Sequence, residues 1–126
     1  MSISVRRKVL VVEDDQDIRE ALAELLGMEG YDVVQAANGQ VALQALSDME
    51  QPCLVLLDLM MPVMDGHEFL ARLSTLGVLP TLPVLVLTAN RGVEAPPGTV
   101  GLMRKPMEMN DLLAAVARYC PPVEAP

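Results

Sequence analysis

Aromatic and basic residues are both scarce in this chain. Its 126 residues include no tryptophan, two tyrosines, one phenylalanine and one histidine, whereas nine residues are methionine. We therefore expect an aliphatic core in which methionine fills gaps. Nine lysines and arginines stand against 17 acidic residues, a net charge of −8. This balance argues against unassisted nucleic-acid binding, which depends on cations that neutralise phosphates.

Long apolar runs and a secretory signal are also missing. No stretch reaches the roughly 18 apolar residues of a membrane helix, and the basic start lacks the apolar core and cleavage site of a signal peptide. We therefore expect a cytoplasmic protein without membrane contact. The two cysteines, Cys53 and Cys120, do not have the spacing of a zinc site. Cys53 opens an apolar run and is expected to be a small core residue.

Segments with strand and helix patterns alternate along the chain, whose length and 52% hydrophobic content fit one domain. This alternation predicts an α/β fold in which a parallel sheet has helices on both faces. We expect the domain to span 1–120 and 121–126 to form a tail. The stretch 90–99 has two prolines and two glycines, which makes a regular helix there improbable. The expected strands are 8–13, 32–36, 53–58, 83–88 and 100–103, and the expected helices are 16–28, 39–49, 65–73 and 109–120.

Reactive side chains stand at the carboxyl ends of these expected strands. Glu13, Asp58 and Thr88 end the first, third and fourth strands, whereas Asp14 follows the first and Lys105 follows the fifth. Because the carboxyl ends of parallel strands share one edge of a sheet, these groups should converge. Clustered carboxylates repel one another unless a cation intervenes, and oxygen ligands suit Mg²⁺ or Mn²⁺. Acids, a hydroxyl, an ammonium and a hard cation are the groups that handle a phosphoryl group.

Four motifs in this order carry a family resemblance. They are VVEDD at 11–15, DLMMPVMDG at 58–66, LTA at 87–89 and KP at 105–106. Together they resemble the CheY-like receiver domain of two-component response regulators, over roughly residues 8 to 119. The resemblance implies a flavodoxin-like (βα)5 fold, with a doubly wound five-stranded parallel sheet in the order 2-1-3-4-5.

The resemblance also implies a role for each matched residue. Asp58 would accept a phosphoryl group from the phosphohistidine of a sensor histidine kinase or of a histidine phosphotransfer protein. Thr88 would hydrogen-bond one phosphoryl oxygen and Lys105 would pair with another. The bond between Lys105 and Pro106 is expected to be cis, although X-Pro bonds are cis in only about 5% of cases. The ligands of Mg²⁺ (or Mn²⁺) would be Glu13, Asp14, Asp58 and the backbone carbonyl of Met60.

The chain departs from the family pattern between Thr88 and Lys105. Receivers typically have an aromatic residue about three positions before the lysine, but here that residue is Leu102. The span is also roughly five residues shorter than usual, so we expect the fourth helix to be shortened or absent. Met60 and Asn90 hold the two positions that tune acyl-phosphate lifetime in this family. Since an apolar Met60 cannot orient a water molecule, we expect a long-lived phosphorylated form.

Two interpretations remain open. The first is a phosphorylation switch that promotes only its own phosphorylation and dephosphorylation and is not otherwise an enzyme. It would act through an unknown downstream protein, without binding nucleic acid itself, as a monomer or weak dimer. The alternative is a pseudo-receiver that binds proteins without being phosphorylated. An aspartyl-phosphate phosphatase is disfavoured because Met60 stands where its second acid would be.

Overall fold

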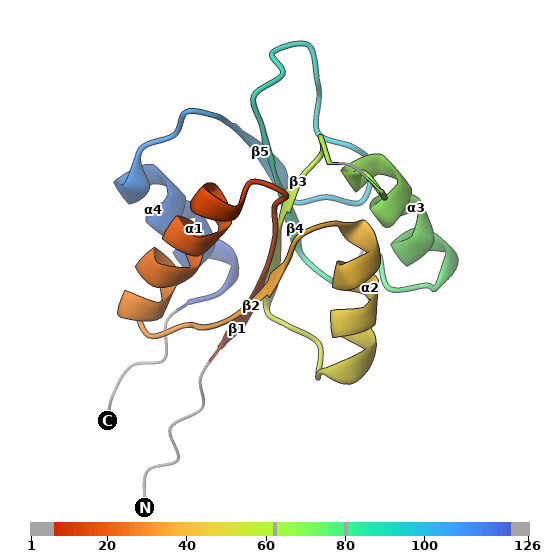
Figure 1. Ribbon diagram of the computed structural model, residues 1–126, viewed down its shortest axis with the longest axis horizontal. Coiled ribbons are helices and arrows are strands. Elements are labelled where there is room, and N and C mark those ends of the chain that lie inside the picture. Colours follow the sequence, from red (N-terminus) through yellow and green to blue (C-terminus); the bar gives the residue numbers. More distant parts are fainter. Residues whose placement is uncertain (1–6, 62, 80, 122–126) are drawn as a thin grey trace, which may run out of the picture.

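Five parallel strands form a sheet in the order β2-β1-β3-β4-β5 (Figure 1), and this confirms the expected topology. The computed structural model describes residues 7–61, 63–79 and 81–121. The expected element boundaries agree with those observed to within a few residues. The strands are β1 (Lys8–Val12), β2 (Asp32–Ala36), β3 (Leu54–Asp58), β4 (Val84–Thr88) and β5 (Gly101–Arg104), and the helices are α1 (Gln16–Met28), α2 (Gly39–Asp48), α3 (Gly66–Thr75) and α4 (Met109–Tyr119).

The helices cover both faces of the sheet. Figure 1 shows α1 and α4 on one side and α2 and α3 on the other. Every residue of β3 and β4 is buried, because strands in the middle of a doubly covered sheet meet apolar side chains on both faces. This explains why their sequences are continuous apolar runs rather than alternating patterns. Packing on both faces therefore holds the carboxyl ends of these strands in fixed positions.

Side-chain caps fix where three helices begin. Asp15, Asn38 and Asp65 each accept a hydrogen bond from the backbone N–H three residues later, at 2.9–3.1 Å. Such caps satisfy donors that the first helical turn leaves free. At the start of α3, a Cβ on Gly66 would lie 2.6 Å from the Cα of Leu59. Glycine therefore allows α3 to approach the end of β3 closely.

The segment between β4 and β5 contains no helix, which confirms that expectation; all of its residues are described. A loop replaces the helix, and Arg104 holds it by donating to the carbonyls of Asn90 at 2.7 Å and Val93 at 3.0 Å. Val93 and Leu102 pack against the core on the α2–α3 side of the sheet. The loop thus supplies part of the cover that a helix would give.

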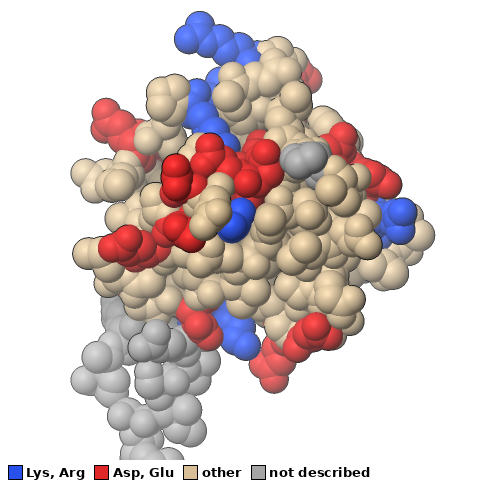
Figure 2. All heavy atoms as spheres, viewed as in Figure 1, with Lys and Arg blue, Asp and Glu red and all other residues tan. Residues whose placement is uncertain are grey.

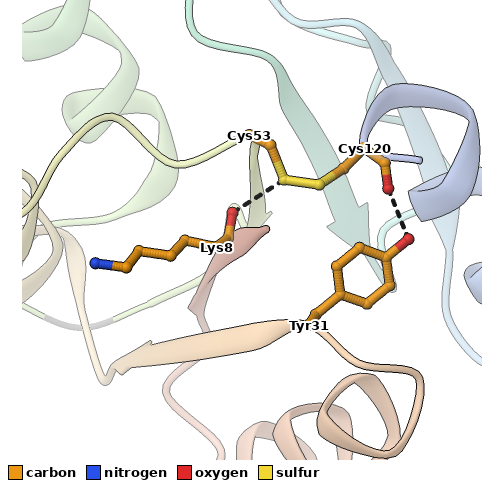
Figure 3. The surroundings of a disulfide bond; sticks show 4 residues. All are labelled: Lys8, Tyr31, Cys53 and Cys120. Carbon is orange, nitrogen blue, oxygen red and sulfur yellow. Dashed lines mark hydrogen bonds between the residues drawn. A yellow bond between two sulfur atoms is a disulfide. The ribbon is translucent and has the colours of Figure 1, made fainter. Parts of the chain in front are cut away.

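The cysteines form a bond that the sequence did not indicate. Cys53, expected to be a small core residue, packs against the core and also forms a disulfide with Cys120 (Figure 3). This contact arises because α4 runs back to the amino end of β3, and a separation of 67 residues gives no hint of it. The basic N-terminal residues 1–6 and most of the expected tail, residues 122–126, lie outside the described residues. Within the described part, no helix is long and apolar enough to cross a membrane.

Candidate functional site

Three carboxylates converge where β1 and β3 end. Glu13, Asp14 and Asp58 each place an oxygen within 4.8 Å of the others. Glu13 and Asp58 are 2% and 5% exposed, whereas Asp14 is open to solvent. Figure 2 shows acidic side chains gathered over the region where α1 begins in Figure 1. The predicted convergence at the carboxyl edge is therefore present.

Lys105 reaches this cluster from the end of β5. Its ammonium forms an ion pair with Glu13 and lies 3.8 Å from Asp58 Oδ2. The Lys105 backbone N–H donates to the carbonyl of Thr88 at 2.8 Å, so the register of β4 and β5 continues one residue beyond β5. The Lys105–Pro106 peptide bond is cis, as expected.

Burial, Asp58 and Lys105 all act on the pKa of the Glu13 carboxyl. Burial raises the pKa of this carboxyl above its ordinary value, and hydrogen bonding and charge repulsion from Asp58 raise it further, although Lys105 opposes them. Removal from water disfavours the charged form of an acid, and a like charge nearby has the same effect. A bound cation would relieve both effects.

Thr88 and Met60 lie at the same carboxyl edge of the sheet but make different hydrogen bonds. Thr88 is fully buried and follows Leu87, the residue that pairs with Asp58 across β3 and β4. Its Oγ1 accepts from the N–H of Asn90 at 3.1 Å, which leaves the hydroxyl proton free to donate elsewhere. Met60 donates its backbone N–H to Asp58 Oδ1 at 3.1 Å, while its side chain is 62% exposed. The role of the Met60 carbonyl as a metal ligand stays a prediction.

Two supporting contacts at the site have no clear signal in the sequence. Arg19 donates from Nη1 to the backbone carbonyl of Glu13 at 2.9 Å and so ties α1 to the acidic cluster. The Asn90 N–H orients the Thr88 hydroxyl. Arg19 lies one turn into a helix of ordinary amphipathic pattern, so no sequence signal distinguished it. Asn90 lies two residues beyond Thr88, and its hydrogen bond depends on the path of the loop, which the sequence does not indicate.

The donor set fits a hard divalent cation. Three carboxylates face one ammonium, which leaves two negative charges in excess if all the acids are ionised. Oxygen ligands of which one is open to solvent suit Mg²⁺, which usually retains several waters. Glu13, Asp14 and Asp58 would hold such an ion.

Topology and site together define a class of protein. The sheet order is that of flavodoxin-like α/β domains, and the polar groups meet at the carboxyl ends of its central strands, where such folds place their binding sites. Residues 9–117 match the family described as response regulator receiver domain. The chain belongs to this family, whose members interact with histidine kinases.

Several known proteins are similar along most of the chain. Response regulator protein FleR of Pseudomonas aeruginosa is 42% identical over 117 residues, which are 89% of this chain and 24% of that protein. Sporulation initiation phosphotransferase F of Bacillus subtilis is 34% identical and covers 93% of this chain and 96% of its own. The chain thus spans about a quarter of the first relative and nearly all of the second.

Solved structures agree with this assignment. The chemotaxis protein CheY4 of Vibrio cholerae has a TM-score of 0.79 at 30% identity and covers 91% of this chain and 99% of its own. A response regulator of Chloroflexus aurantiacus has a TM-score of 0.81 at 30% identity, with coverages of 91% and 98%. The fold is therefore CheY-like.

Proposed function

We propose that this domain is a phosphorylation switch in which Asp58 is the phosphoacceptor. The observation that carries the proposal is the position of this nearly buried carboxylate, between two further acids and the Lys105 ammonium. The carboxylate oxygen would attack the phosphorus of a phosphohistidine, so that an O–P bond forms as the N–P bond breaks. The leaving imidazole nitrogen keeps the electrons of that bond and takes up a proton. The domain would not otherwise act as an enzyme.

The neighbouring residues fit the needs of this transfer. Mg²⁺, when bound by the carboxylates, would neutralise charge on the phosphoryl oxygens. Lys105 would exchange its pairing with Glu13 for a phosphoryl oxygen, and the hydroxyl of Thr88 would donate to another. Rigid central strands support these positions, and prior placement of charged groups is a large source of phosphoryl-transfer catalysis.

A groove beside the site supports a helical protein partner. Its volume is about 400 Å³ and it runs between α1 and the segment that leads into α4. Apolar side chains line most of it, including Ile18 and Met109, which are 36% and 61% exposed. Lys105 lies at the same groove. A kinase or phosphotransfer helix that packs there would bring its histidine close to Asp58. The proposed site of this transfer is the cytoplasm.

A pseudo-receiver is the second candidate. The absence of a helix between β4 and β5, together with Leu102 in the usual aromatic position, favours it, because the usual route for conformational change is altered. In this case the domain would bind a protein partner without any phosphoryl transfer.

Beryllofluoride, which mimics a phosphoryl group on a carboxylate, separates the two candidates. With Mg²⁺ present, we expect large amide shifts in the NMR spectrum around Asp58, Thr88 and Lys105, and acetyl phosphate should add one phosphoryl group by mass. Asp58→Asn should abolish both responses, whereas Asp48→Asn, on the exposed surface of α2, should leave them unchanged. A wild-type protein that gains no phosphoryl group and shows no shifts would be a pseudo-receiver.

A further inference from the structure

The two cysteines lie far from the acidic site. Cys53 immediately precedes β3, whereas Asp58 is the last residue of that strand, so five residues of extended chain, about 16 Å, separate the two ends. Cys120 caps the carboxyl end of α4 and is fully buried. The bond between the cysteines thus joins the last turn of α4 to the amino-terminal edge of the sheet (Figure 3).

Hydrogen bonds of the backbone also hold both cysteines in place. The N–H of Cys53 donates to the carbonyl of Lys8 at 2.9 Å, and the N–H of Cys120 donates to Val116 at 2.7 Å. The Tyr31 hydroxyl donates to the Cys120 carbonyl at 2.6 Å in a buried setting. The Cα atoms are 5.5 Å apart, within the usual range for disulfides. The reduced thiols would therefore stay close enough to react again.

In the reduced state, the Cys53 thiol would have a hydrogen-bond acceptor within reach. Cys53 Sγ lies 3.0 Å from the carbonyl oxygen of Lys8. A disulfide sulfur has no proton to donate, but a Cys53 thiol would donate to this oxygen. Figure 3 shows this contact beside the disulfide. Because thiols are weak donors and behave as small apolar groups in cores, the fold accommodates both redox states.

We propose that Cys53 and Cys120 form a reversible thiol–disulfide switch that clamps the last turn of α4 to the sheet. Cys53 is partly exposed, whereas Cys120 has no exposed surface, so exchange with a small disulfide starts at Cys53. The Cys53 thiolate attacks one sulfur of oxidised glutathione, and one glutathione thiolate leaves. The Cys120 thiolate then attacks the Cys53 sulfur of the mixed disulfide and releases the second glutathione. Two electrons pass from the cysteines to glutathione.

The disulfide restrains the end of α4, which contains none of the residues proposed for phosphoryl transfer. Leu112 and Val116 anchor the middle of α4 in the core in either state. At the end of the helix, reduction leaves the Tyr31 hydroxyl bond to Cys120, the Tyr119 hydroxyl bond to the Val100 carbonyl at 3.2 Å and the packing of Cys120. We expect the final turn to fray more in the reduced state, because helix ends open at low free-energy cost unless they are tied down. The inference is independent of the function proposed for Asp58.

The test equilibrates the native chain, without any phosphodonor, in glutathione buffers of stepped redox ratio. Alkylation followed by mass spectrometry should show an intramolecular bond between Cys53 and Cys120 that forms and reverses in a monomer. Hydrogen exchange of the backbone amides over residues 117–120 should be at least tenfold slower in the oxidised form. Exchange within β3 should change little.

Matched variants separate the clamp from a general loss of packing. Cys53→Ser retains a donor for the Lys8 carbonyl and should exchange at the rate of the reduced wild type, with no response to glutathione. Tyr31→Phe keeps both cysteines and should still respond. The proposal is overturned if both thiols stay fully alkylatable in oxidised glutathione, if the bond forms between two chains, or if the α4 amides exchange equally in both states.

Discussion

At the scale of single residues, the acidic cluster is arranged around the Lys105 ammonium, for which the proposed function requires a second partner. Lys105 pairs with Glu13 in the described structure, yet the proposed chemistry requires it at a phosphoryl oxygen. The pairing partly offsets the cost of burying Glu13, which is 2% exposed. Sequence similarity identified both residues, but not their mutual pairing, because 92 positions separate them.

The raised pKa of Glu13 predicts a pH dependence. Because the folded protein holds this proton more tightly than the unfolded chain, the native state binds more protons above the ordinary pKa of 4.5. Stability without metal should therefore fall as the pH rises from about that value through the higher folded pKa. Glu13→Gln should flatten this fall, as measured by urea unfolding in EDTA across the pH range.

Glu68→Gln is the matched control for the same measurement, since Glu68 is exposed on α3 and pairs with Arg72 on the surface. It should retain the slope of the wild type. An unchanged slope in Glu13→Gln would show that burial of this carboxyl does not control the pH dependence.

Met60 gives a kinetic prediction at the same scale. Its exposed thioether lies two residues beyond Asp58 and offers no strong hydrogen bond to a water that would attack the acyl phosphate. Met60→Asn should speed loss of the phosphoryl group by about tenfold, or about 1.4 kcal/mol in the barrier. Timed mass spectrometry after removal of acetyl phosphate measures the rate. Met60→Leu should stay slow, and an equal rate in all three proteins would exclude this role.

At the scale of elements, the β4–β5 loop takes the place of a helix. Its contacts connect it to the site, since Asn90 donates to Thr88 through its N–H and accepts from Arg104 through its carbonyl. A displacement of Thr88 would therefore be transmitted to the loop through Asn90. The prolines and glycines of this segment predicted that the helix would be missing. They could not predict that the Arg104 side chain would hold the loop in place.

Arg104→Lys tests this link. Lysine keeps the charge but loses the planar fork that binds two carbonyls, so the loop should open more easily by about 1 kcal/mol, or roughly fivefold. Hydrogen exchange at the Val93 amide, which donates to the Asn90 carbonyl at 3.4 Å, reports the opening. Arg91→Lys alters an exposed residue of the same loop and should leave that rate unchanged. Equal rates in both variants would contradict the role of Arg104.

The elements themselves were largely predictable. Buried parallel strands produce continuous apolar runs, and Asp15, Asn38 and Asp65 are capping residues at recognisable positions. The contact between Cys53 and Cys120 was not predictable, because it depends on where α4 ends in space. The same holds for the contact between Arg19 and Glu13, which depends on how α1 is rotated against β1. Local patterns define elements, whereas packing defines contacts between them.

At the scale of the whole molecule, the net charge of −8 places the acidic cluster within a generally negative protein. General charge repulsion is screened by any salt, whereas a specific site distinguishes Mg²⁺ from monovalent ions. At a concentration a hundredfold above its dissociation constant, a ligand that binds only the native state stabilises it by about 2.7 kcal/mol. We therefore expect Mg²⁺ to raise the free energy of unfolding by that amount over sodium chloride of equal ionic strength.

Substitution of Asp14 tests whether this stabilisation comes from the carboxylate cluster. It is exposed and belongs to the carboxylate cluster, so its substitution should cause little loss of packing. Asp14→Asn should lose most of the stabilisation by Mg²⁺ but keep the response to sodium chloride. Asp32→Asn, at the opposite end of the sheet on β2, should keep both. If Mg²⁺ and sodium chloride stabilise the wild type equally, the carboxylates act as a diffuse charge and not as a metal site.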